Sequence, residues 1–207
     1  MKPKALAIVT QVRRLYHRYG IKSVTMDDVA TQLNISKKTI YEHFTDKEDL
    51  VRHVLMLEHD SRCCRLDEIE KHNYNAIEEL FEVYKMINVT LKEYNPSMEY
   101  DVRKYYPDLF MKIKEDRRKR MYKASFDNMN KGKKEGLYRK ELNSKIIAKL
   151  HVFRIEYMLD SGMFTLEEVT SLKMFHEIFV YHLHGILSHE GRAFFESNFD
   201  KFKSSLA

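Results

Sequence analysis

The chain has 207 residues, 43% of them hydrophobic and 32% charged, and its formal net charge is +5. This balance supports a hydrophobic core and excludes an intrinsically disordered chain, while the mild positive charge is compatible with a polyanionic partner without requiring one. Only six glycines and three prolines are present. Because β folds need these residues at their many turns, we expect an all-α fold with short connections.

The N-terminal residues predict a first helix and the start of a second. Apolar side chains recur at steps of three and four over residues 5–19, which indicates the buried face of a helix. Gly20 follows at the position where a helix commonly ends in a left-handed residue. Thr25 and Asp28 have the spacing of a capping box, so a short second helix is expected to begin there and to end at Leu33.

A tight turn and a third helix are expected next. Asn34 is the expected turn residue, because asparagine tolerates a positive φ better than most residues that carry a side chain. Ser36 can cap a third helix that runs to about His43, with Ile40 and Phe44 facing the interior. A short helix, a tight turn and another short helix make up the helix-turn-helix pattern.

Beyond residue 50 the apolar pattern lengthens and predicts a larger helical body. Pro96 and Pro107 suit the first turns of helices, where proline costs a helix least. We therefore expect one domain over residues 1–50 and a second over residues 51–207. The expected helices cover residues 47–70, 75–94, 97–105, 107–131, 143–160 and 166–189, followed by an amphipathic stretch from Arg192 to Phe202.

Residues 20–50 closely resemble the DNA-reading segment of the TetR family of repressors. They include the two elements that follow the helix-turn-helix in that family, Tyr41-Glu-His-Phe44 and Lys47-Glu-Asp-Leu50. The resemblance implies an all-α fold with an N-terminal tri-helical helix-turn-helix DNA-binding domain and a larger helical ligand-binding and dimerisation domain. It also implies a transcription regulator that binds double-stranded DNA.

The residues expected to contact DNA lie on the second, third and fourth helices. A recognition helix has to present hydrogen-bond donors to the major groove and to phosphates, and a helix N-terminus adds free backbone N–H groups. The family usually has glycine where this chain has Asn34, a departure that should preserve the turn. A solvated helix face is the alternative for Lys37 and Lys38. Lys47 resembles a phosphate-binding lysine of the family, and a solvated lysine is the alternative there. The predicted contacts are Thr25, Met26, Ser36, Lys37, Lys38, Thr39, Tyr41, His43 and Lys47.

A homodimer is expected, because two readers related by a two-fold axis can span two half-sites of DNA. The last two long helices carry apolar stripes that would pair across such an axis as a four-helix bundle. Packing within one subunit is the alternative for each of these residues. The predicted interface residues are Leu150, Phe153, Tyr157, Phe175, Phe179, Leu183 and Ile186.

The resemblance also implies an effector pocket in the helical body. The middle helices are rich in aromatic residues and methionine, which can line an apolar pocket with a few hydroxyl groups. Simple core packing is the alternative. The predicted lining residues are Phe81, Tyr84, Phe110, Tyr122, Phe126 and Tyr157, and the effector would be a small apolar or aromatic molecule.

Several other classes of protein are not expected. The sequence has no nucleophile elbow, no metal-ligand set and no glycine-rich cofactor loop, so we expect neither an enzyme nor a metal or cofactor. A disulfide between the adjacent Cys63 and Cys64 would be strained, which fits a reducing compartment. No apolar run approaches the roughly 18 residues of a membrane span, and residues 1–7 lack the apolar core of a signal peptide. We expect a cytoplasmic protein that has no membrane partner.

Two mechanisms follow from these expectations. The first is a repressor that binds a near-palindromic operator as a homodimer and is released when a small molecule binds the body. The alternative is a DNA-bound scaffold of the same fold, whose body recruits a protein partner. A sealed body with an exposed apolar patch would favour the scaffold.

Overall fold

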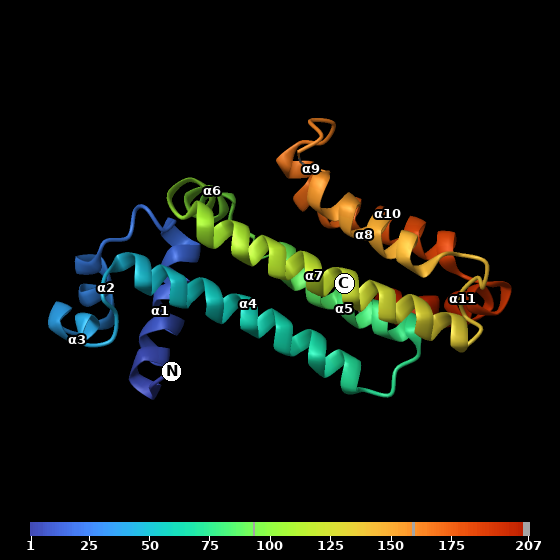
Figure 1. Ribbon diagram of the computed structural model, residues 1–207, viewed down its shortest axis with the longest axis horizontal. Coiled ribbons are helices and arrows are strands. Elements are labelled where there is room, and N and C mark those ends of the chain that lie inside the picture. Colours follow the sequence, from blue (N-terminus) through green and yellow to red (C-terminus); the bar gives the residue numbers. More distant parts are fainter. Residues whose placement is uncertain (93, 159, 205–207) are drawn as a thin grey trace. The chain divides into compact units, whose positions relative to one another are not determined.

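The computed structural model describes residues 1–92, 94–158 and 160–204, and the regular elements within these ranges are helices (Figure 1). This confirms the predicted all-α fold. The helices in chain order are α1 (Pro3–Tyr19), α2 (Met26–Leu33), α3 (Lys37–Tyr41), α4 (Lys47–Lys71), α5 (Ala76–Lys92), α6 (Pro96–Tyr105), α7 (Pro107–Lys134), α8 (Ser144–Tyr157), α9 (Leu166–Thr170), α10 (Leu172–Ile186) and α11 (His189–Ser204).

The chain divides into two compact packing units. Unit 1 consists of Met1–Cys64 together with Asn95–Glu115, and unit 2 consists of Arg65–Tyr94 together with the chain from Asp116 onward. Helices α4 and α7 each continue from one unit into the other. Unit 1 therefore contains α6 in addition to the N-terminal helices, while the expected domain boundary after residue 50 stays a prediction.

The turns of the N-terminal region follow the local chemistry expected from the sequence. Thr25 and Asp28 form the predicted capping box at the start of α2. Asn34 ends this helix with φ 51° and ψ 46°, in the left-handed region. Gly20 ends α1 at φ 80°, a backbone conformation that is cheap only for glycine. These three predictions are confirmed.

The prediction of a single helix over residues 166–189 is wrong, because the chain leaves the helical conformation twice within this range. Ser171 is extended between α9 and α10, and its hydroxyl accepts a hydrogen bond from the Met174 backbone N–H at 3.1 Å. Leu187 is extended again before α11 begins at His189. Serine offers the backbone a local hydrogen bond that competes with the helical one, which periodicity alone does not reveal.

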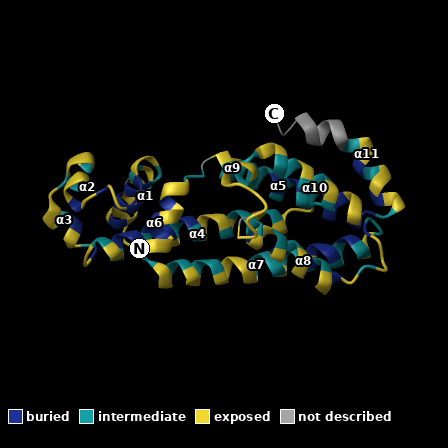
Figure 2. Ribbon diagram, turned by 90° about the horizontal axis from the view of Figure 1, so that it is seen from above, coloured by how far each residue is buried: buried dark blue, intermediate teal, exposed yellow. Residues whose placement is uncertain are grey.

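Unit 1 has one continuous hydrophobic core beneath α1, α2, α3, α4 and α6 (Figure 2). Ile40 and Phe44 lie in it, as the sequence predicted. Burying one such side chain contributes roughly 1.5–3 kcal/mol, so the short helices α2 and α3 depend on this shared core. Its other buried members are Ala5, Ile8, Val9, Val12, Tyr16, Ile21, Val24, Met26, Val29, Leu50, Val51, Val54, Leu55, Met98 and Val102.

Unit 2 has its own core, formed by α5, α7, α10, α11 and the segment after α7. Tyr138 is fully buried, and its hydroxyl lies 3.0 Å from both the Ala76 carbonyl oxygen and Asn128 Oδ1. Its ring packs directly on Gly132, where any Cβ would collide with it. The buried apolar members are Ala76, Ile77, Phe81, Met129, Tyr138, Leu183, Ile186, Leu187 and Phe195.

Neither a membrane span nor a metal site occurs within the described ranges. No helix there combines the length and the apolar character that crossing a lipid bilayer requires. Among the side chains that the structure describes, which end at residue 198, no three or more histidine, cysteine or acidic groups gather as a metal site.

Candidate nucleic-acid interface

The N-terminus of α2 is an exposed polar corner of unit 1. The Thr25 hydroxyl accepts a hydrogen bond from the Asp28 backbone N–H at 3.2 Å, and the Thr25 backbone N–H donates to Asp28 Oδ2 at 2.8 Å. Hydrogen bonds from Thr25 lower the pKa of Asp28, which stays ionised in its cap. The cap holds the first turn of α2 in place and leaves the Thr25 side chain at the surface.

The predicted recognition helix, α3, is shorter than the sequence suggested and ends at Tyr41 instead of about His43. Ser36 caps it, since its hydroxyl accepts a hydrogen bond from the Thr39 backbone N–H at 3.0 Å. Ile40 anchors the inner face, and Lys37, Lys38 and Tyr41 are exposed. The helix, held in place by the buried Ile40, therefore exposes two ammonium groups and a phenol to solvent.

The lysines of α3 differ in their surroundings. Lys37 Nζ donates to Asp27 Oδ2 of α2 at 2.7 Å, and this hydrogen bond raises the pKa of the lysine. Both side chains are exposed, so the pair is weakly held and a phosphate can compete for the ammonium group. Lys38 is also exposed. Together the two lysines place positive charge on the exposed surface of α3.

The half-buried Lys47 has a role that the sequence did not predict. Its ammonium group donates to the carbonyl oxygen of Ile21 at 2.7 Å and lies 3.4 Å from that of Lys22. Burial lowers the pKa of Lys47, and the charge of Asp101 opposes that effect. The predicted phosphate-binding lysine thus holds the loop between α1 and α2, and its three N–H donors leave room for a further acceptor.

Two predicted DNA contacts are less exposed than expected. The Met26 side chain lies in the core of unit 1, because the apolar face of α2 starts at its first residue. Only its backbone N–H, at the first helical position, remains for a phosphate. His43 is half-buried in the turn after α3, and its ring lies edge-on to Phe44. The nine predicted residues otherwise share one region of unit 1, and their DNA contacts stay predictions.

The predicted effector-pocket residues do not form one group. Phe110 packs against the core of unit 1, whereas the other five lie in unit 2. Tyr84 stacks on Phe175 with ring centroids 4.8 Å apart, and Tyr122 stacks on Phe126 at 6.1 Å. Several of these aromatic residues therefore pack in a core. Core packing was the alternative that the sequence left open.

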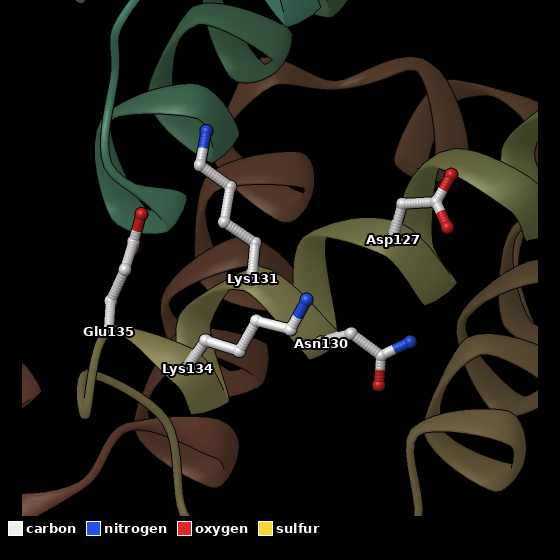
Figure 3. Close-up of a pocket in the computed structure, with 5 residues that line it drawn as sticks. All are labelled: Asp127, Asn130, Lys131, Lys134 and Glu135. Carbon is white, nitrogen blue, oxygen red and sulfur yellow. The ribbon is translucent and has the colours of Figure 1, made fainter.

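One hollow of about 480 Å³ lies at the end of α7, lined by charged and amide side chains (Figure 3). Lys131 Nζ lies 3.2 Å from Glu79 Oε2, and Glu135 accepts a hydrogen bond from the Ala76 backbone N–H at 2.7 Å. These contacts tie α7 to the start of α5. The hollow contains none of the predicted aromatic residues and does not have the lining of an apolar effector pocket.

The predicted dimer-interface residues fall into two groups. Leu150, Phe153 and Tyr157 are exposed on α8. Leu183 and Ile186 were also expected at the interface, and within the single chain both are buried in the core of unit 2, so their place at an interface stays a prediction. Phe175 and Phe179 likewise pack within the unit, against Tyr84 and, for Phe179, against Phe81. An apolar stripe looks the same in sequence whether its own chain or another chain covers it.

The N-terminal region of the chain matches a known protein family. Residues 8–54 match the family described as "Bacterial regulatory proteins, tetR family". The matched segment runs from α1 into α4 and so contains α2, α3 and the turn between them. A search among curated proteins found no match.

Solved structures of regulators share the fold over most of the chain. A transcriptional regulator from Cytophaga hutchinsonii has a TM-score of 0.74 at 18% identity, covering 89% of this chain and 99% of that one. A TetR-family regulator from Agrobacterium tumefaciens has a TM-score of 0.65 at 17% identity, with coverages of 89% and 98%. A gamma-butyrolactone receptor has a TM-score of 0.64 at 13% identity, with coverages of 97% and 96%. Residues 8–54 thus match the tetR family, and the chain as a whole has the fold of solved transcriptional regulators, TetR-family members among them.

Proposed function

We propose that the protein is a DNA-binding transcription regulator that reads its operator with α3. The observation that carries this proposal is the outer face of α3, where Lys37, Lys38 and Tyr41 are exposed while Ile40 is fully buried. Side chains of this kind bind phosphates and base edges of the major groove. The capped N-terminus of α2 adds Thr25 as a phosphate contact beside it.

A homodimer would present two copies of α3 to one DNA site. Helix α8 supports this part of the proposal, because four large apolar side chains lie exposed along one of its faces. Ile146, Leu150, Phe153 and Tyr157 are 55%, 57%, 60% and 43% exposed, and their spacing of four, three and four residues gives a continuous stripe. A second copy of the chain would bury this stripe and hold the readers about 34–36 Å apart, one DNA turn.

Release by a small molecule would make the regulator a repressor that responds to an effector. The similar gamma-butyrolactone receptor supports an effector-responsive repressor, because that protein is named for a small organic ligand. In unit 2 the Tyr84 hydroxyl lies 3.2 Å from His176 Nδ1, beside the rings of Phe175 and Phe179. An apolar effector that entered this aromatic cluster would meet one hydrogen-bonding pair to orient it.

The exposed stripe on α8 also fits the alternative function, a DNA-bound scaffold that recruits another protein. An exposed apolar surface marks a contact with some partner, and its sequence does not say which one. The mass of the protein in solution decides between them. A dimer in which the stripe is buried supports the repressor, whereas a monomer with the stripe exposed supports the scaffold.

DNA binding is tested by fluorescence anisotropy with DNA from upstream of the coding region and with random DNA. The variant Lys37→Ala/Tyr41→Ala should lose most of the selective binding, and removing one phosphate-binding lysine should lower the salt slope by about one unit. Lys112→Ala/Tyr100→Ala is a matched control, because it removes the same two side-chain types from exposed positions outside α2 and α3. Equal binding to all DNA by the wild type and both variants would contradict the proposal.

A further inference from the structure

Helix α6 is part of the same packing unit as the DNA-reading helices, although it comes after α5 in the chain. Met98 and Val102 of α6 are buried in the core shared with α1 and α4. Asn95 caps the helix by accepting a hydrogen bond from the Ser97 backbone N–H at 2.9 Å, and its Nδ2 donates to the carbonyl of His17 in α1. Helix α6 is thereby held against the end of α1.

Asp101 extends this attachment to the loop between α1 and α2. Its side chain is buried, with only 8% of the residue exposed, and its Oδ2 accepts a hydrogen bond from the Lys22 backbone N–H at 2.7 Å. A Cβ on Gly20 would lie 3.3 Å from the same oxygen, so the carboxylate occupies the space that this glycine leaves. A buried carboxylate needs such a donor, because leaving it unpaired is costly.

The same loop is held from the other side by Lys47 of α4. The ammonium group binds the carbonyl oxygens of Ile21 and Lys22, whereas Asp101 binds the N–H of Lys22. The Lys22 side chain in turn lies over the ring of Tyr105 in α6, with its Nζ 4.2 Å from the ring centroid. The backbone N–H of Lys22 is thus bound by the carboxylate of Asp101 in α6, and its carbonyl oxygen is bound by the ammonium group of Lys47 in α4.

We propose that Asp101 is a positioning residue of the DNA reader. Its carboxylate fixes the loop that leads into α2 and so sets where the Thr25 cap and the N-terminus of α2 meet a phosphate. Thr25 follows Lys22 closely in the chain, so a displaced loop carries the cap with it. This inference rests on the proposed DNA-binding function, and it assigns part of that function to a helix outside the segment that matches the tetR family.

The test compares Asp101→Ala with Asp101→Asn, which keeps an acceptor oxygen, and with Glu99→Ala, which removes an exposed acid from the same helix. Operator affinity is measured by anisotropy at a temperature at which thermal unfolding shows every variant to be folded. Hydrogen exchange of residues 20–24 is measured on the same samples. Asp101→Ala should bind about tenfold more weakly, the loss expected for one hydrogen bond to a charged group.

The expected pattern separates positioning from general stability. Asp101→Asn should keep most of the affinity, Glu99→Ala should bind as tightly as the wild type or slightly more tightly, and exchange should rise in residues 20–24 of Asp101→Ala alone. Wild-type affinity in Asp101→Ala, or equal loss in Asp101→Asn, would overturn the inference while leaving the proposed function intact. A wild-type protein that selects no DNA would overturn both, and the exchange of residues 20–24 would still report whether Asp101 holds the loop.

Discussion

Asn34 shows how one residue sets the angle between α2 and α3. Its φ is 51°, and among the described residues no other residue except glycine has a positive φ. Its backbone N–H donates to Thr31, and the Ile35 backbone N–H donates to Ala30 at 3.0 Å, so the turn closes on the end of α2. The side chain is exposed, and the backbone conformation is therefore what selects this residue.

We expect Asn34→Gly to leave stability unchanged or slightly raised, because glycine adopts this conformation without strain. Asn34→Val should lower the free energy of unfolding by about 1–2 kcal/mol, because a β-branched side chain is strained at positive φ. Urea denaturation of both variants measures the difference. A valine variant as stable as the glycine variant would contradict this account of the turn.

Residue-scale predictions succeeded where the cause is local. The capping box of Thr25, the turn at Asn34 and the inward positions of Ile40 and Phe44 follow from neighbouring residues and are confirmed. The contact between Asp101 and Lys22 spans 79 residues of sequence, and no local signal announces it. Such a contact depends on where α6 packs, which only the folded chain determines.

At the scale of elements, α8 and α10 place two half-buried histidines together. The rings of His151 and His182 lie 4.9 Å apart, and Arg154 Nη2 lies 3.2 Å from His151 Nδ1. Burial lowers the pKa of His151 to about 3 and that of His182 to about 4, and the positive charge of Arg154 adds to both shifts. Both imidazoles are therefore neutral in the folded protein at neutral pH.

This pair should make the protein less stable in mild acid. The unfolded chain binds protons at these histidines below about pH 6.5 while the folded chain does not, so the free energy of unfolding falls as the pH drops. The loss is up to about 2 kcal/mol per histidine between pH 7 and pH 5. Above about pH 6.5 their contribution is fully present.

Denaturation curves at several pH values test this prediction. His151→Leu/His182→Leu should flatten the pH dependence between about pH 7 and pH 5, whereas His72→Gln, which changes an exposed histidine, should leave it unchanged. The slope is the diagnostic quantity, because the leucine variants also alter packing at every pH. The same slope in the wild type and the double leucine variant would show that other groups cause the acid sensitivity.

For the apolar helices of the body, the sequence predicted the secondary structure more successfully than it predicted what each helix packs against. Leu150 and Phe153 share their periodic pattern with Leu183 and Ile186, yet the first two are exposed and the last two are buried in unit 2. Ser171 divides a helix that the sequence predicted as continuous. The sequence did not show this, because serine occurs both at helix N-caps and within helices. Hydrophobic periodicity predicts a buried face and does not say what buries it.

At the scale of the whole molecule, the exposed stripe on α8 predicts the state of the protein in solution. Light scattering should give twice the chain mass of 24.9 kDa. Leu150→Glu/Phe153→Glu should give a single chain and much weaker operator binding, because charges in the stripe prevent its burial. Met111→Glu, which changes another exposed apolar residue, is the control and should remain dimeric.

The central claim, that a two-fold pair of α3 helices reads DNA, is tested most directly by selecting binding sites from random DNA with the wild-type protein. The account predicts a near-palindromic site whose half-sites are centred about 10–10.5 base pairs apart, or a multiple of that spacing. A Lys37→Ala/Tyr41→Ala protein should enrich no such site. Enrichment of no sequence by the wild type, or of the same site by the variant, would contradict the claim that α3 is the reader.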